Sequence, residues 1–129
     1  MFKRYLHESD LLSENQVPVM FLLNEAANTD IIGFVQNLCC GIGSSYDFST
    51  CAFYDELDEY DKNDTPEYAG LWIGNEGNEE IIVSYNDLYY YLEILYKRFD
   101  SDNYPELEKL HSLLDSFRLR YNSEVSKGS

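Results

Sequence analysis

The sequence predicts a single α+β domain over residues 1–129, in which a small antiparallel sheet of about three strands packs with four or five helices. Three observations support this fold class. Apolar residues recur at helical spacing in the first and last thirds of the chain, short β-rich runs lie between them, and no internal repeat or domain-sized linker interrupts the order. A hydrophobic content of 44% and an aromatic content of 16% separate the chain from disordered acidic segments.

Two helices are expected before the sheet. Residues 1–16 are weakly patterned and are expected to be weakly ordered, as are residues 122–129. Pro18 suits the first turn of a helix that runs to Asn28, because the missing N–H of proline is no loss there. Thr29 or Asp30 can cap a second helix, and Gly41 follows it as a stop. The buried stripe of this second helix is expected at Ile31, Phe34, Val35, Leu38 and Cys39.

Three short segments are expected to form the antiparallel sheet. Residues 50–54 alternate as a strand, and residues 68–74 and 80–84 are β-rich runs joined by a turn that contains Gly77. The segment between the first two strands, residues 55–67, carries seven carboxylates and one lysine and is expected to be a solvated loop. The helices are expected on one face of this sheet.

Two helices are expected after the sheet. Ser84 begins a variant of the capping box with Asp87 three residues on, and Pro105 suits the first turn of the last helix. The inner face of the first of these helices is expected to be Leu88, Tyr91, Leu92, Leu95 and Phe99. That of the second is expected to be Leu107, Leu110, Leu114, Phe117 and Tyr121.

The charge of the chain is strongly negative and unevenly distributed. The formal net charge is −15, and residues 5–96 contain eighteen Asp or Glu but only one base, Lys62. Such a surface has poor affinity for nucleic acid and for anionic membranes, so direct binding to either is not expected. A partner with a basic surface, a bound cation or solubility alone can each account for the acidity.

The sequence carries no catalytic or metal-binding signature, so the chain is not expected to be an enzyme and no cofactor or metal is expected. His7 and His111 are the only histidines available as a general base. A calcium-loop pattern that starts at Asp61 fails, because its sixth position is Pro66 and its twelfth is Trp72.

The cysteines and the N-terminal residues predict a cytoplasmic protein. Cys39 and Cys40 are adjacent and Cys51 is alone, an odd count that fits neither a disulfide framework nor a zinc site. The basic start is not followed by the apolar segment of a signal peptide, and the longest apolar run, residues 17–23, is too short to span a bilayer.

The candidate binding residues are the carboxylates and tyrosines of the acidic segment. Tyrosine is favoured at protein interfaces because it buries a large area at small entropic cost, and carboxylates pair with Lys and Arg of a basic partner. The predicted contacts are Tyr54, Asp55, Glu56, Asp58, Glu59, Tyr60, Asp61, Asp64 and Glu67.

The central part of the chain, residues 41–96, resembles a known family of bacterial proteins. The residues that carry the resemblance are a glycine turn at Gly41, Cys51-Ala52-Phe53, the acidic segment, Gly70-Leu71-Trp72-Ile73, and Ile81-Ile82-Val83-Ser84-Tyr85 followed by Leu88 and Tyr91-Leu92. This pattern is similar to that of the ribonuclease-toxin immunity proteins of contact-dependent growth inhibition, the CdiI type. The resemblance implies a cytoplasmic inhibitor that binds the C-terminal nuclease domain of a CdiA-type toxin as a 1:1 complex and occludes its basic active-site cleft.

Three other functions fit the same acidic segment. An acidic DNA mimic that regulates a DNA-binding protein would need carboxylates spaced like duplex phosphates. A cation-buffering loop would bind calcium more tightly than the millimolar range. An acidic globular protein whose partner uses another surface is the third alternative.

Overall fold

The computed structural model describes residues 3–77 and 79–121 and has the predicted α+β architecture. Within these residues the strands are β1 (Ser44–Ser45), β2 (Ser49–Ala52), β3 (Leu71–Asn75) and β4 (Glu80–Val83), antiparallel in the order β1-β2-β3-β4. The α-helices are α1 (Val17–Thr29), α2 (Ile31–Cys39), α3 (Glu59–Asp64), α4 (Tyr85–Ser101) and α5 (Leu107–Arg120). Short 3-10 turns cover Glu8–Asp10, Glu14–Gln16 and Tyr54–Glu56.

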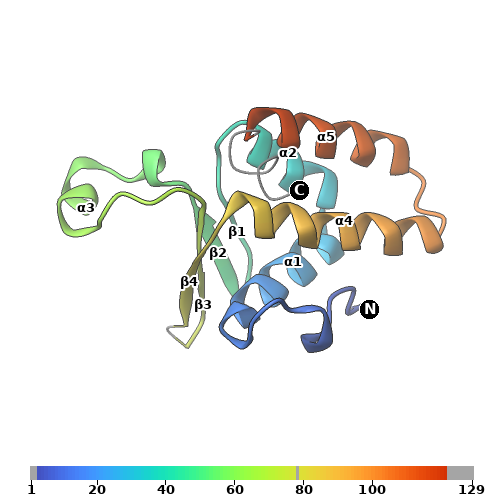
Figure 1. Ribbon diagram of the computed structural model, residues 1–129, viewed down its shortest axis with the longest axis horizontal. Helices are drawn as coiled ribbons and strands as arrows, with labels where there is room; N and C mark the ends of the chain where they lie inside the picture. The colour runs from blue at the N-terminus through green and yellow to red at the C-terminus, as the bar shows by residue number, and fades with distance from the viewer. Residues whose placement is uncertain (1–2, 78, 122–129) are drawn as a thin grey trace.

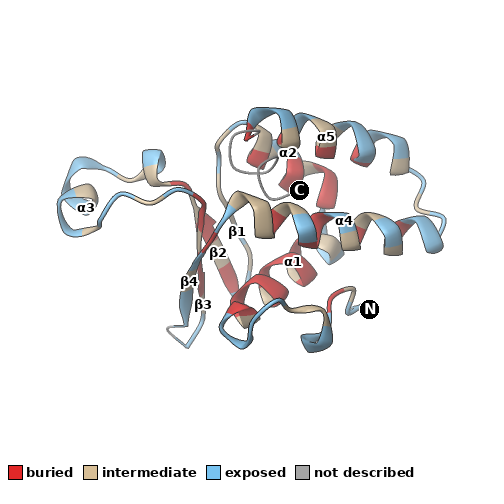
Figure 2. Ribbon diagram, viewed as in Figure 1, coloured by how far each residue is buried: buried red, intermediate tan, exposed pale blue. Residues whose placement is uncertain are grey.

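One face of the sheet packs on helices and the other does not (Figures 1 and 2). Cys51, Leu71, Ile73 and Val83 point into the core and are buried. Helix α1 lies against β2 and β3, while α4 and α2 each pack on α5. The expected placement of the large helices on one face is therefore what the structure shows, and no helix of residues 3–77 and 79–121 covers the opposite face.

The predicted caps at Asp30 and Ser84 form, and most residues of the predicted stripes are buried, whereas Cys39 and Leu107 are only half-buried. The Asp30 carboxylate accepts a hydrogen bond from the Gly33 N–H at 3.0 Å, and the Ser84 hydroxyl accepts one from the Asp87 N–H at 3.1 Å. These bonds satisfy backbone donors that the first turn of a helix otherwise leaves free. All five predicted inner residues of α4 are buried.

Three element boundaries differ from the predictions by two residues or more. Strand β2 ends at Ala52, two residues early, because Tyr54 already belongs to a 3-10 turn. The strand predicted from residue 68 begins at Leu71, since Gly70 has a left-handed φ of 133° that interrupts the extended backbone. Helix α5 begins at Leu107, after a turn at residues 105–106, and the two-residue strand β1 was not predicted.

Residues 3–16 make more specific contacts than their weak sequence pattern predicts. The Asn24 side chain accepts hydrogen bonds from the N–H groups of Tyr5 and Leu6, both at 2.9 Å, and donates one to the Leu6 carbonyl at 3.0 Å. Leu6 is completely buried. Arg98 binds the Asp10 carboxylate through two nitrogens at 2.6 and 2.8 Å, and this guanidinium lowers the pKa of Asp10. Residues 122–129, for which weak order was also predicted, lie outside the described residues.

None of the helices in the described ranges is both long enough and apolar enough to cross a membrane.

Candidate functional site: an acidic arm

Residues 54–68 form a projection that we call the acidic arm. It leaves the sheet at the end of β2, returns before β3 and extends away from the helical layer (Figure 1). The solvated loop predicted here contains a short helix, α3, none of whose residues is buried. A helix of six residues is marginally stable in water unless other contacts support it. Hydrogen bonds at the start of α3 and at the base of the arm provide such support.

The base of the arm is fixed by Glu56. Its Oε1 atom accepts hydrogen bonds from the backbone N–H groups of Gly43 and Phe53, both at 2.8 Å. These contacts join the arm to the turn before β1, thirteen residues away in the sequence. Glu56 was predicted to bind a partner; in the structure its carboxylate forms hydrogen bonds to the backbone of the protein itself.

Two tyrosines also hold the base of the arm. The Tyr68 hydroxyl donates to the Ala52 carbonyl at 3.2 Å, and burial raises the pKa of this hydroxyl. The Tyr68 ring meets the Tyr54 ring edge to face, with centroids 5.3 Å apart. The Lys62 ammonium lies 5.4 Å from the centre of the Tyr54 ring. Tyr54 is thus already packed against two neighbours and is not a free aromatic anchor.

Helix α3 is capped by another predicted binding residue. The Asp58 carboxylate accepts a hydrogen bond from the Asp61 N–H at 2.8 Å, the arrangement of an N-cap. Asp58 and Glu56 therefore shape the arm through hydrogen bonds within the fold.

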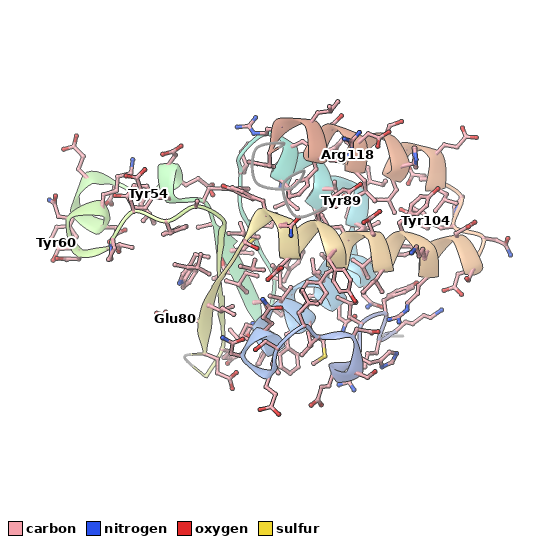
Figure 3. All side chains as sticks on the ribbon, in the orientation of Figure 1. Tyr54, Tyr60, Glu80, Tyr89, Tyr104 and Arg118 are labelled. Carbon is pink, nitrogen blue, oxygen red and sulfur yellow. The ribbon has the colours of Figure 1, made fainter. Side chains whose placement is uncertain are left out.

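The remaining predicted residues are exposed on the arm. Tyr60 has 76% of its surface exposed and lies at the outer end of the arm (Figure 3). The exposed carboxylates are Asp55, Glu59, Asp61, Asp64 and Glu67. The arm therefore presents an uncovered aromatic ring among negative charges, the combination that suits a basic protein surface.

We expect Glu56→Ala to destabilise the protein by about 1 kcal/mol, because two backbone N–H groups lose an ionised acceptor and only solvent replaces it. In urea unfolding followed by circular dichroism, the midpoint should fall, whereas Glu59→Ala should leave it unchanged within error. Equal effects of the two substitutions would contradict the different roles assigned to these glutamates.

The cysteines of the described residues differ in exposure: Cys40 is exposed, and Cys39 and Cys51 are at least partly buried. No three His, Cys, Asp or Glu residues among them are grouped so that they could hold a metal ion. Burial raises the pKa of the Cys51 thiol to about 12, so it stays protonated and a poor nucleophile at neutral pH. The Cys39 thiol donates to the Leu113 carbonyl at 3.4 Å, a packing role.

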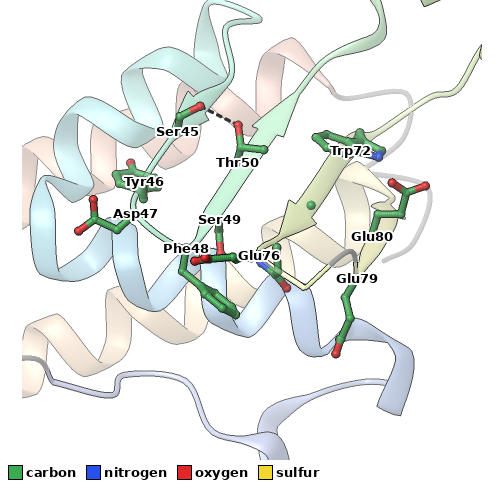
Figure 4. A pocket seen from close by; sticks show the side chains of 12 residues that line it. Ser45, Tyr46, Asp47, Phe48, Ser49, Thr50, Trp72, Glu76, Glu79 and Glu80 are labelled. Atoms are coloured by element: carbon green, nitrogen blue, oxygen red, sulfur yellow. Dashed lines mark hydrogen bonds between the residues drawn. The ribbon is translucent and has the colours of Figure 1, made fainter.

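Sequence reasoning missed a hollow on the uncovered face of the sheet (Figure 4). It has a volume of about 540 Å³ and is lined by residues of all four strands and of the two turns at one end of the sheet. Trp72 and Phe48 supply aromatic surface, and the carboxylates come from Asp47, Glu76, Glu79 and Glu80. The sequence signal was the alternation of Trp72 with buried neighbours in β3, which places the indole on the outer face.

Comparison with known proteins found no match to this chain among protein-family models, curated proteins or solved structures.

Proposed function

We propose that this protein is an immunity protein: it binds the C-terminal nuclease domain, a ribonuclease, of a contact-dependent growth inhibition toxin and occludes its basic active-site cleft. The observation that carries the proposal is the acidic arm, which holds seven carboxylates and one lysine in residues 55–67 and projects from the domain. The family resemblance of residues 41–96 supports the same function.

The electrostatic argument concerns what a nuclease must expose. An enzyme that cleaves RNA binds phosphates with Lys and Arg in its cleft, and these side chains are unneutralised when no RNA is bound. An acidic projection meets them with opposite charge, which accelerates encounter and excludes the substrate from the same site. Because inhibition requires only occupancy, the inhibitor performs no chemistry.

Exposure and hydrogen bonding support a division of the proposed contacts into two groups. Tyr60 is the central aromatic anchor because its ring is uncovered, and Glu59, Asp61 and Asp64 surround it with exposed carboxylates. Asp55 and Glu67 flank this group nearer the base of the arm. Glu56, Asp58 and Tyr54 hold the arm in shape and contribute to affinity mainly by preorganising it.

The test is co-purification with the C-terminal domain of the large polypeptide encoded directly upstream, followed by RNA cleavage at rising inhibitor ratio. We expect a 1:1 complex and complete loss of cleavage at equimolar inhibitor. Absence of a complex, or a complex that still cuts RNA, would overturn the proposal. A complex with a duplex-DNA-binding protein instead would favour the DNA-mimic alternative.

A further inference from the structure

The hollow on the uncovered sheet face is built around Trp72 and Gly74. A Cβ atom placed on Gly74 would lie 2.6 Å from Cη2 and 2.8 Å from Cζ2 of Trp72, and these side-chain atoms are its nearest neighbours. The indole therefore lies directly over the backbone of residue 74. Gly74 does not have a positive φ, so the backbone alone does not require glycine there. The absence of a side chain at residue 74 is what lets the indole lie across the strand.

Strand register places a carboxylate beside this indole. Gly74 pairs with Thr50 on β2 and with Glu80 on β4, and paired residues of antiparallel strands point to the same face. Thr50 and Glu80 therefore flank the covered position on its two sides. Figure 4 shows Trp72 and Glu80 on the same side of the sheet.

The acidic rim of the hollow has no cationic partner within the described part of the chain. Asp47 comes from the turn before β2, and Glu76 and Glu79 come from the turn between β3 and β4. The ion pairs found among residues 3–77 and 79–121 join Lys3 to Asp102, Arg98 to Asp10 and His111 to Asp115, and none involves this rim. Within the described residues, no salt bridge neutralises the carboxylates that line the hollow.

An aromatic platform with unpaired carboxylates at its side suits one side chain above all. The arginine guanidinium is planar, stacks on tryptophan and is more weakly hydrated than an ammonium group. Its nitrogens also form paired hydrogen bonds with a carboxylate. A hollow of about 540 Å³ has room for such a side chain and the backbone that carries it.

We propose that the outer sheet face is a second docking surface, on which an arginine of a partner protein stacks on Trp72 and pairs with Glu80. This inference rests on the proposed function in taking the partner to be the same basic nuclease domain, and it makes the interface bipartite. Tyr60 and Glu80 both lie on the side of the sheet away from the helices (Figure 3). One convex partner surface can therefore contact the arm and the sheet face together.

The test uses the whole chain and a blocked hexapeptide, Gly-Ser-Arg-Arg-Ser-Gly, with a matched peptide in which citrulline replaces both arginines. Trp72 is the only tryptophan, so its indole N–H gives one assignable signal in an amide-correlation NMR spectrum. We expect the arginine peptide to shift this signal and the amide signals of Gly74 and Thr50 saturably, and the citrulline peptide to shift none of them.

Two variants separate the contribution of the Trp72 indole to peptide binding from that of the Glu80 carboxylate. Gly74→Ala leaves every charge unchanged but displaces the indole, and Glu80→Gln leaves the indole in place but removes its neighbouring carboxylate. Each should weaken peptide binding about three- to tenfold. The dispersion of the amide signals and the far-ultraviolet circular dichroism spectrum report whether each variant is folded.

An arm variant distinguishes a failure of this inference from a failure of the proposed function. Replacing Glu59, Asp61 and Asp64 by lysine should leave the Trp72 response to the peptide within about twofold of the wild type. If peptide binding weakens as much in this arm variant as in Glu80→Gln, the peptide is attracted by the net charge of the protein alone. That result would overturn the proposed docking surface. An equal response to the citrulline peptide, or no saturable response to either peptide, would also overturn it. Peptide binding without any nuclease complex would leave the docking surface standing and remove the proposed function.

Discussion

Replacement of Glu59, Asp61 and Asp64 by lysine should abolish inhibition of the cognate nuclease. The three carboxylates are exposed around Tyr60, and their reversal converts attraction to a basic cleft into repulsion. Close charge pairs at protein interfaces couple by roughly 1.5 kcal/mol or more each, so we expect affinity to fall at least about 1,000-fold. The association rate should fall as well, and its dependence on salt should weaken or reverse. Stopped-flow association and RNA cleavage at fixed inhibitor measure both effects.

The matched control reverses three carboxylates far from the arm. Glu93, Asp100 and Glu108 are exposed on α4 and α5, and their replacement by lysine changes the net charge by the same amount. This control should keep most of its affinity and its full inhibition. If both triple variants fail alike, net charge and not the arm is responsible. If the arm variant protects as well as the wild type, the arm is not the contact surface.

Asn24→Ala should destabilise the fold by about 3 kcal/mol, the largest effect that we expect from a single polar substitution. Asn24 is only 3% exposed, and its amide satisfies two backbone N–H groups and one carbonyl of residues 5–6. Removal of the Asn24 amide leaves these backbone groups without hydrogen-bond partners in a buried position. Each unpaired group costs about 1–3 kcal/mol of folding free energy if the surrounding structure does not rearrange. The urea midpoint should fall without a change in slope, and the Leu6 amide should exchange faster with solvent.

Asn28 provides the control for this substitution. It bonds to the backbone N–H and carbonyl of Lys3 with the same amide chemistry, but it is exposed. Water can replace its bonds, so Asn28→Ala should cost no more than about 1 kcal/mol. Similar losses for Asn24→Ala and Asn28→Ala would show that burial of the amide does not govern its contribution.

The helices and their caps were predictable because each depends on nearby residues. The Asp30 and Ser84 caps bond to groups three residues on, and the buried stripes of α2 and α4 follow from the helical repeat. The contacts of residues 3–16 were not predictable in the same way. They depend on Asn24 and Arg98, which lie far along the chain and give no periodic signal.

The sequence predicted where the acidic arm lies on the surface. It did not predict which of its carboxylates bond within the fold and which are exposed. The density of charge identified residues 55–67 as surface, since such a segment cannot be core. Seven similar carboxylates, however, look alike in a sequence. Only the fold shows that Glu56 bonds to Gly43 across the sheet end while Glu59 is free to contact a partner. The Trp72 platform was missed for a related reason, because the glycine that makes room for it looks like an ordinary strand glycine.

The uncovered face of the sheet also bears on how copies of this protein behave toward each other. This face presents Trp72 and also Ile82, which is 45% exposed and lies in the edge strand β4. Exposed apolar side chains at a sheet edge favour association between copies of a protein. At neutral pH the rim carboxylates give two such faces the same charge, and they repel. Acidification toward the isoelectric point near 4.2 removes the net charge of the protein, and with it the repulsion between copies, while the apolar face stays in place. We therefore expect the carboxylates proposed to bind a cationic partner also to act as gatekeepers that oppose association between copies of the free protein.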